Sequence, residues 1–218
     1  MDETYVKQLM EAQEVSLTTK QAKIIISAIE IFAEKGYAAT STSEIAKQAG
    51  VAEGTIFRHF PTKKDLLLSI VKPGLMKLAV PFFASQMVND IFKKEFNEFE
   101  DLLRAFITNR LEFVEGNLPL IKIVLQEIAF HEEIQIVLKE NFQAKVYPRL
   151  EEVIIAFQKQ GKLKEFPIPT IIRFSLSTFL GFVITRYIVM PNKQWDNERE
   201  IDDMITFIMN GIESGQAI

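Results

Sequence analysis

The stretch AGVAEGTIFRHF, residues 49–60, is the feature that most constrains the fold of this chain. Segments of helical character lie on both sides of Gly50, which interrupts them. Glycine adopts positive φ angles without a steric penalty, so one helix can end here and turn sharply into another. In such a pair Ala46 is small where the helices cross, and Val51 and Ile56 fill the wedge between them. The stretch therefore predicts two short helices joined at a tight corner.

Capping signals define the neighbouring helices. The capping-box spacing of Thr18 with Gln21, and of Ser41 with Glu44, opens one helix before Gly36 and a second one that runs to residue 49. A third short helix is expected over residues 53–60, and a fourth begins at residue 63.

The rest of the chain has helical periodicity, and no segment alternates with the period of a strand. The predicted fold class is therefore all-α. Prolines separate the expected helices, with a kink near Pro148; these helices cover residues 63–72, 74–90, 98–115, 118–129, 131–160, 169–190 and 197–213.

Two helices joined at such a corner form the helix-turn-helix pattern, in which one helix braces a second in the DNA major groove, which is about 12 Å wide. A glycine corner alone is also common in all-α proteins that bind no DNA. The longer string from Gly36 to Leu66, GYAATSTSEIAKQAGVAEGTIFRHFPTKKDL, is far more specific. It resembles the N-terminal DNA-binding domain of the TetR family of bacterial transcriptional regulators. The matching motifs are the glycine-aromatic end of helix one, I-A-x-x-A-G-V, G-T-x-aromatic-x-x-F, and K-x-x-L.

The resemblance implies a domain layout and a function. It implies an N-terminal arm (1–17), a helix-turn-helix DNA-binding domain (18–64), and a larger helical domain for effector binding and dimerisation (65–218). The expected function is a ligand-responsive transcriptional regulator, with repression favoured over activation. It would bind a palindromic double-stranded DNA operator as a homodimer and be released by a small apolar or amphipathic effector.

The resemblance also implies which residues contact DNA. They are Thr42, Ser43, Glu53, Gly54, Thr55, Phe57, Arg58, His59 and Lys63. Hydroxyls and cations in this set are expected at phosphates, the phenylalanine at a thymine methyl, and the arginine at guanine or phosphate. Ile56 and Phe60 are expected in the core.

The chain departs from the family pattern at two positions of the third helix. Ala52 stands where many members have serine, and Phe57 where many have tyrosine, so a cap and a phosphate hydrogen bond are expected to be missing. In addition, Glu53 is acidic, which repels phosphate but allows it to accept from a cytosine amine.

A dimer surface is expected on the last two helices. Ser177, Gly181 and Thr185 form a stripe of small residues, and the last helix has an apolar face of Ile201, Ile205 and Ile208. Together these faces can build a four-helix interface around a two-fold axis. The alternative is that both helices pack only within one subunit.

Effector-binding candidates come from the phenylalanine-rich C-terminal region. They are Phe106, Arg110, Phe113, Glu127, Phe130, His131, Tyr147, Arg173 and Phe174. Large apolar side chains with a few polar ones suit an apolar or amphipathic ligand. Most such aromatics are simply core residues, and each polar candidate can instead be part of a surface ion pair. The helix over residues 63–72 is the expected lever between effector and DNA.

Composition points to a folded cytoplasmic protein. The chain is 48% hydrophobic and has no cysteine, which excludes disulfides and thiolate metal sites. No secretory signal is expected at the acidic N-terminus. The apolar segment 171–190 contains Arg173 and Arg186, so we expect a buried helix there and no membrane association.

Charge and histidine content weigh against other functions. The net charge is −4, yet residues 18–64 carry seven lysines or arginines against four glutamates, a basic head on an acidic body. The chain has two histidines, His59 and His131, and no glycine-rich phosphate loop, so no catalytic residue, metal or cofactor is expected. The remaining alternative is a helical carrier or sensor of lipid-like molecules that has lost DNA binding.

Overall fold

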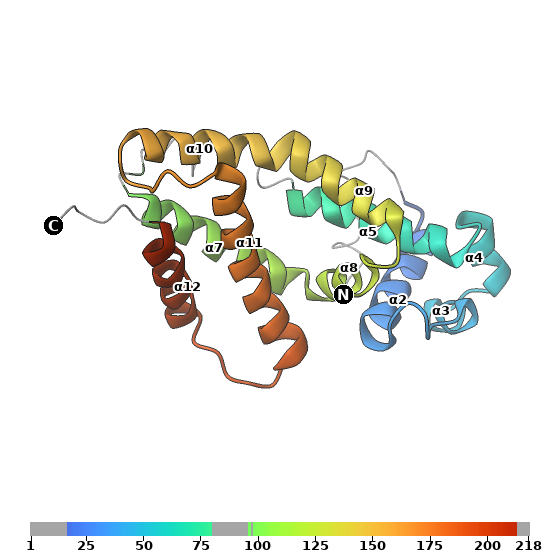
Figure 1. The fold of residues 1–218 in the computed structure, drawn as a ribbon. Helices are drawn as coiled ribbons and strands as arrows, with labels where there is room; N and C mark the ends of the chain where they lie inside the picture. Colours follow the sequence, from blue (N-terminus) through green and yellow to red (C-terminus); the bar gives the residue numbers. More distant parts are fainter. Residues whose placement is uncertain (1–16, 80–95, 97, 213–218) are drawn as a thin grey trace. The chain divides into compact units, whose positions relative to one another are not determined.

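The computed structural model describes residues 17–79, 96 and 98–212 (Figure 1). Every regular element in these ranges is helical, which confirms the predicted all-α class. The predicted N-terminal arm lies almost entirely outside the described residues, as does most of the helix predicted over 74–90.

The chain divides into two compact units. Unit one is Met1–Val80 with Asn117–Phe142, and unit two is Pro81–Gly116 with Gln143–Ile218. This division does not follow the predicted domain boundary after residue 64, because the helices that follow it pack into the same core as the N-terminal helices.

Unit one begins with α2 (Thr19–Lys35), α3 (Thr42–Ala49) and α4 (Glu53–His59). Both predicted capping boxes are present. The backbone N–H of Gln21 donates to Thr18 Oγ1 over 3.3 Å, and that of Glu44 donates to Ser41 Oγ over 3.2 Å. Gly36 ends α2 at a φ of 82° and a ψ of 155°, a positive φ that glycine adopts without a steric penalty but that is not the left-handed helical conformation.

Helices α5 (Lys63–Ala79), α8 (Leu118–Glu127) and α9 (Glu132–Asn141) complete unit one. The prediction that Pro73 ends a helix is wrong, because α5 runs through it. A proline inside a helix costs about 3 kcal/mol through a lost hydrogen bond and a clash. Val71 and Leu75, on either side, are buried in the shared core. Burial of two such side chains, at about 1.5 to 3 kcal/mol each, offsets that cost.

Unit two contains α7 (Phe99–Gly116), α10 (Tyr147–Lys159), α11 (Ile168–Ile184) and α12 (Asn197–Ile212). Helix α12 packs against α7 and α11, and α10 packs against α11. Two π-helical turns interrupt the α-helical hydrogen bonding, η2 (Phe142–Val146) before α10 and η3 (Thr185–Val189) after α11. The helix predicted over 131–160 is thus divided, and η2 lies immediately before the expected kink at Pro148.

The apolar helix α11 with η3 is far more exposed than predicted. Over Ile168–Val189 it is long and apolar enough to cross a membrane by length and composition alone, and 22% of that window is buried. The prediction of a buried helix is therefore wrong for the single chain. Phe174 is 61% exposed, and Val189 is 65% exposed. Arg186, in contrast, turns into unit two and pairs with Glu115 over 3.0 Å.

The close approach of α5 and α8 gives a stability prediction. A Cβ on Gly74 would lie 2.9 Å from Cγ of Leu120 and closer still to its methyl groups, and Leu120 is buried. We expect Gly74→Ala to lower the free energy of unfolding by about 1 to 3 kcal/mol through overpacking. Chemical denaturation of both proteins measures the difference. Gly116→Ala is the matched control, since no atom lies within 4 Å of that Cβ position. Equal stability of Gly74→Ala and wild type would contradict the packing argument.

Candidate functional site

The corner between α3 and α4 has the geometry that the sequence predicts. Gly50 ends α3 in the left-handed region, at a φ of 67° and a ψ of 34°. The next N–H, of Val51, donates to the carbonyl of Ala46 over 3.0 Å, which closes the end of the helix. Ile56 and Phe60 are buried in the unit one core, as predicted. The corner thus holds the inner face of α4 against the other helices.

The outer face of α4 is free in the single chain. Glu53, Gly54 and Arg58 are exposed, and Phe57 is 44% exposed. The remaining two candidates on this helix, Thr55 and His59, are half-buried at its margins. Ala52 at the N-cap of α4 makes no capping hydrogen bond through its side chain, as expected for an alanine where many family members have serine.

The first residues of α3 and α4 are joined directly. The hydroxyl of Thr42 donates to Oε1 of Glu53 over 2.5 Å. Ser43 beside it is exposed. The candidates at the start of α3 therefore lie on the same side as the start of α4.

The side chain of Lys63 makes its hydrogen bonds within the protein. Its Nζ donates to the carbonyls of Tyr37 and Thr40, over 2.8 and 2.7 Å, and lies 4.3 Å from the centre of the Tyr37 ring. The side chain therefore stabilises the loop between α2 and α3. A phosphate contact by Lys63 would have to replace these bonds.

An ion pair ties α3 to the end of α2. Lys35 Nζ lies 2.8 Å from Oε1 of Glu44. The hydrogen bond from Lys35 lowers the pKa of Glu44 to about 2, and the same bond raises the pKa of Lys35. Because the carboxyl pKa is depressed in the folded protein, this pair stabilises the fold above the ordinary carboxyl pKa of 4.5. The contribution is lost as the pH falls toward 2.

Two predicted effector residues, Glu127 and His131, pair with each other in unit one, beside the loop that follows α2. Oε2 of Glu127 lies 3.2 Å from Nε2 of His131, and both side chains are largely buried. The His131 ring packs edge-on against Tyr37, with 5.3 Å between the ring centroids. Phe130 beside them is 80% exposed and lies at the surface of the unit.

The structure brings three other effector candidates together on α7. Arg110 is 4% exposed, and its guanidinium carbon lies 5.3 Å from the centre of the Phe113 ring. Phe106 is half-buried one turn earlier. Burial lowers the pKa of Arg110 to about 10, and Asn109 Oδ1 accepts a hydrogen bond from its Nε over 3.2 Å. A buried cation among aromatic rings is suited to an anionic group on an otherwise apolar molecule.

The other candidates in unit two are more exposed. Tyr147 is half-buried at the start of α10, and Arg173 lies on the surface of α11 with its guanidinium 5.2 Å from the Phe174 ring centre. The predicted effector residues thus divide between the two units.

The dimer candidates divide into an outer and an inner set. Ser177 and Gly181 of α11, and Thr185 at the start of η3, are all exposed, as an interface stripe requires. The isoleucines of α12 point the other way. Ile201, Ile205 and Ile208 are 7%, 1% and 7% exposed, because α12 packs against α7 and α11 within the subunit. The expectation that these three face a partner is therefore corrected.

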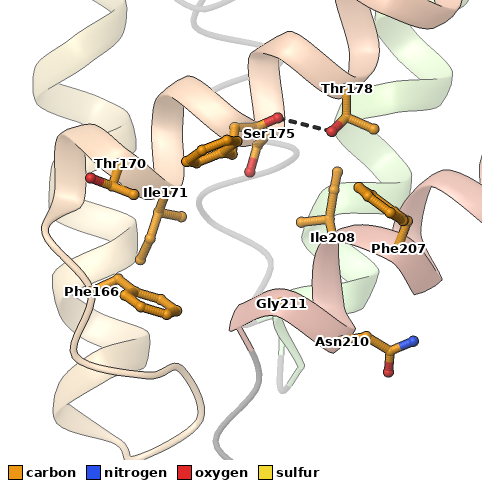
Figure 2. Close-up of a pocket in the computed structure, with 10 residues that line it drawn as sticks. Phe166, Thr170, Ile171, Ser175, Thr178, Phe207, Ile208, Asn210 and Gly211 are labelled. Carbon is orange, nitrogen blue, oxygen red and sulfur yellow. Dashed lines mark hydrogen bonds between the residues drawn. The ribbon is translucent and has the colours of Figure 1, made fainter.

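An apolar groove of about 520 Å³ lies between α11 and α12 (Figure 2). Phe166 and Ile171 lie on one side of it, and Phe207 and Ile208 on the other. The full lining is Phe166, Thr170, Ile171, Phe174, Ser175, Thr178, Phe207, Ile208, Asn210 and Gly211. Sequence reasoning missed Phe207, which is 73% exposed. The available signal was a large aromatic residue off the isoleucine face of an amphipathic helix.

Comparison with known proteins gives one family match. Residues 24–70 match the model of bacterial regulatory proteins of the tetR family. This range contains the corner, the outer face of α4 and the loop held by Lys63.

The similar proteins include regulators of fatty acid metabolism. The fatty acid metabolism regulator protein of Bacillus subtilis (strain 168) is 28% identical over 196 residues, which cover 89% of this chain and 96% of the relative. The structure of FadR from Bacillus subtilis in complex with stearoyl-CoA is 26% identical with a TM-score of 0.62, over 88% of this chain and 98% of that chain. The fatty acid degradation regulator FadR from Bacillus halodurans shares the fold, with 22% identity and a TM-score of 0.68, over 90% of this chain and 98% of that one.

Proposed function

The chain belongs to the TetR family of bacterial regulatory proteins, and on that premise we propose that it is a dimeric repressor released from a palindromic operator by an acyl thioester effector. One observation carries the proposal. The left-handed corner at Gly50 buries Ile56 and leaves the outer face of α4 free to enter a major groove.

The side chains on this face match the chemistry of a DNA groove. Arg58 can donate to guanine or to phosphate, and Phe57 can pack on a thymine methyl. Gly54 has no side chain to keep the backbone away from the duplex. Ser43 and Thr55 have hydroxyls, and His59 a ring N–H, that can donate to phosphates at the margins of this face.

Dimerisation would supply a second recognition helix for the second half-site of the operator. One helix in one groove makes few contacts, so helix-turn-helix proteins pair on half-sites about 34 to 36 Å apart. The exposed apolar residues of α11 and α12, among them Phe174, Leu180 and Phe207, form a surface that monomeric proteins rarely leave open to water. A second copy of this chain covers it most simply, because a two-fold axis brings the same stripe of Ser177, Gly181 and Thr185 against itself.

The effector proposal rests on α7 and on the relatives. Arg110 is a buried cation beside Phe113 and one turn from Phe106. An acyl-CoA has a long apolar chain and an anionic carrier, which suits that combination. A relative of known structure was solved with stearoyl-CoA, and another is named for fatty acid metabolism. Binding that prefers one arrangement of the dimer weakens operator affinity by linkage.

The DNA-binding proposal is tested on an operator selected by the wild-type protein from random duplexes. Arg58→Ala should weaken binding to it about 5- to 150-fold if the residue reads guanine, or lower the salt dependence by about one counterion if it contacts phosphate. Fluorescence anisotropy at several salt concentrations measures both. Lys139→Ala, an exposed cation on α9, is the matched control. Selection of no duplex by the wild type would favour the carrier without DNA binding.

The dimer proposal is tested at two exposed glycines. Gly181→Arg should convert the protein to a monomer, because a long charged side chain prevents the close approach of two helices. Gly116→Arg is the control, since both glycines lie in helices with no atom within 4 Å of the added Cβ. Light scattering after gel filtration gives the mass of each. A dimer in both variants would place the interface elsewhere.

The effector proposal is tested by titrating stearoyl-CoA into the operator complex. We expect operator affinity to fall about 5- to 150-fold, the usual size of an allosteric coupling, and CoA alone or stearate alone to have less effect. Arg110→Met should reduce the response while preserving the fold, since an apolar side chain of similar length replaces a buried cation. Arg149→Met, on the exposed side of α10, serves as control. An undiminished response in Arg110→Met would remove Arg110 from the effector site.

A further inference from the structure

The hydrogen bond between Thr42 and Glu53 fixes a carboxylate on the DNA-facing side of the protein. The two residues are the first of α3 and of α4, and the Thr42 hydroxyl donates to Oε1 of Glu53 over 2.5 Å. The Glu53 side chain is not used to cap its helix, since the cap position is Ala52. Oε1 therefore already accepts a hydrogen bond, and the second carboxylate oxygen, Oε2, is available to accept another.

The charge of Glu53 needs compensation when DNA binds. Among the described residues, no lysine or arginine lies within ion-pair distance of it, in contrast to Glu44 and Glu133. A carboxylate beside the phosphate backbone is repelled. The start of the recognition helix is also the part that contacts base edges. Glu53 thus adds a cost to every duplex that does not offer it a hydrogen-bond donor.

Base edges differ in what they can offer a carboxylate. In the major groove guanine and thymine present acceptors, and the donors are the N6 amine of adenine and the N4 amine of cytosine. Adenine carries the acceptor N7 next to its amine, which repels a carboxylate, whereas cytosine presents its amine alone. We infer that Glu53 is a specificity-determining residue that requires cytosine at one position of each operator half-site, with Thr42 as the residue that positions its carboxylate. This inference rests on the proposed DNA-binding function.

The test compares base preferences, position by position, in duplexes selected by the wild type and by variants. The wild type should prefer cytosine at one half-site position by about 5- to 150-fold, the discrimination of one good base contact. Glu53→Ala should lose the preference at that position alone and bind non-cognate duplexes more tightly, because the repulsion is gone. Thr42→Val should lose part of the preference, and Thr42→Ser, which keeps the hydroxyl, should restore it. Glu34→Ala, an exposed acid on α2, should change no base preference.

The outcomes separate this inference from the proposed function. If the wild type selects a palindrome and Glu53→Ala has the same preference at every position, the inference is overturned and the proposed function stands. A uniform loss of affinity by folded Glu53→Ala on all duplexes also overturns it, because that result indicates a structural role. If the wild type selects no duplex, both are overturned. Circular dichroism of each variant establishes that it is folded.

Discussion

The left-handed backbone at Gly50 determines which side of α4 is available to a partner. A residue with a Cβ in this conformation costs about 1 to 2 kcal/mol, so glycine lets the chain reverse where α3 ends. The N–H of Val51 then bonds back to Ala46, and Ile56 packs inward. Since α-helical residues turn by about 100° each, burial of Ile56 leaves Gly54 and Arg58 on the opposite side and Phe57 on the flank between. One backbone conformation thus sets which surface of α4 is exposed.

Local features of this head were predictable from sequence because their partners are near in the chain. Each capping box joins residues three positions apart. The bonds of Lys63 were not predictable, since its carbonyl partners lie 26 and 23 residues away and meet it only after α2, α3 and α5 have packed. Lys63, which the family pattern predicts as a phosphate contact, therefore also stabilises the loop between α2 and α3. The bond from Thr42 to Glu53 likewise depends on the corner between them.

Periodicity identifies the faces of a helix but not what covers each face. In α12 the isoleucine face is satisfied within the subunit, so its burial says nothing about a partner. In α11 the apolar residues surround the helix, and the other helices of unit two cover only part of it. An apolar sequence alone fits a core helix, a membrane span or an interface equally well. The exposure of Phe174 and Phe207 beside the small-residue stripe, together with the inward pairing of Arg186 and Glu115, favours the interface.

Contacts inside unit one bear on how an effector signal reaches the DNA-binding helices. Tyr37 of the loop after α2 packs on His131, and Lys64 of α5 pairs with Glu133 of α9. Such contacts contribute about 0.5 to 1.5 kcal/mol for an aromatic pair and about 0 to 1 kcal/mol for an exposed ion pair. Beneath them, α2 and α8 share a core in which Ile123 and Val124 are buried.

Separating α8 from α2 would therefore expose several side chains, each worth about 1.5 to 3 kcal/mol. That cost exceeds the 1 to 3 kcal/mol that allosteric coupling typically supplies. A displacement of α8 or α9 is thus cheaper if α2 and the attached α3 and α4 move with it. An effector signal that displaced α8 or α9 would therefore carry α2, α3 and α4 with it, and α5, the lever expected from sequence, would be one of several helices that share the movement.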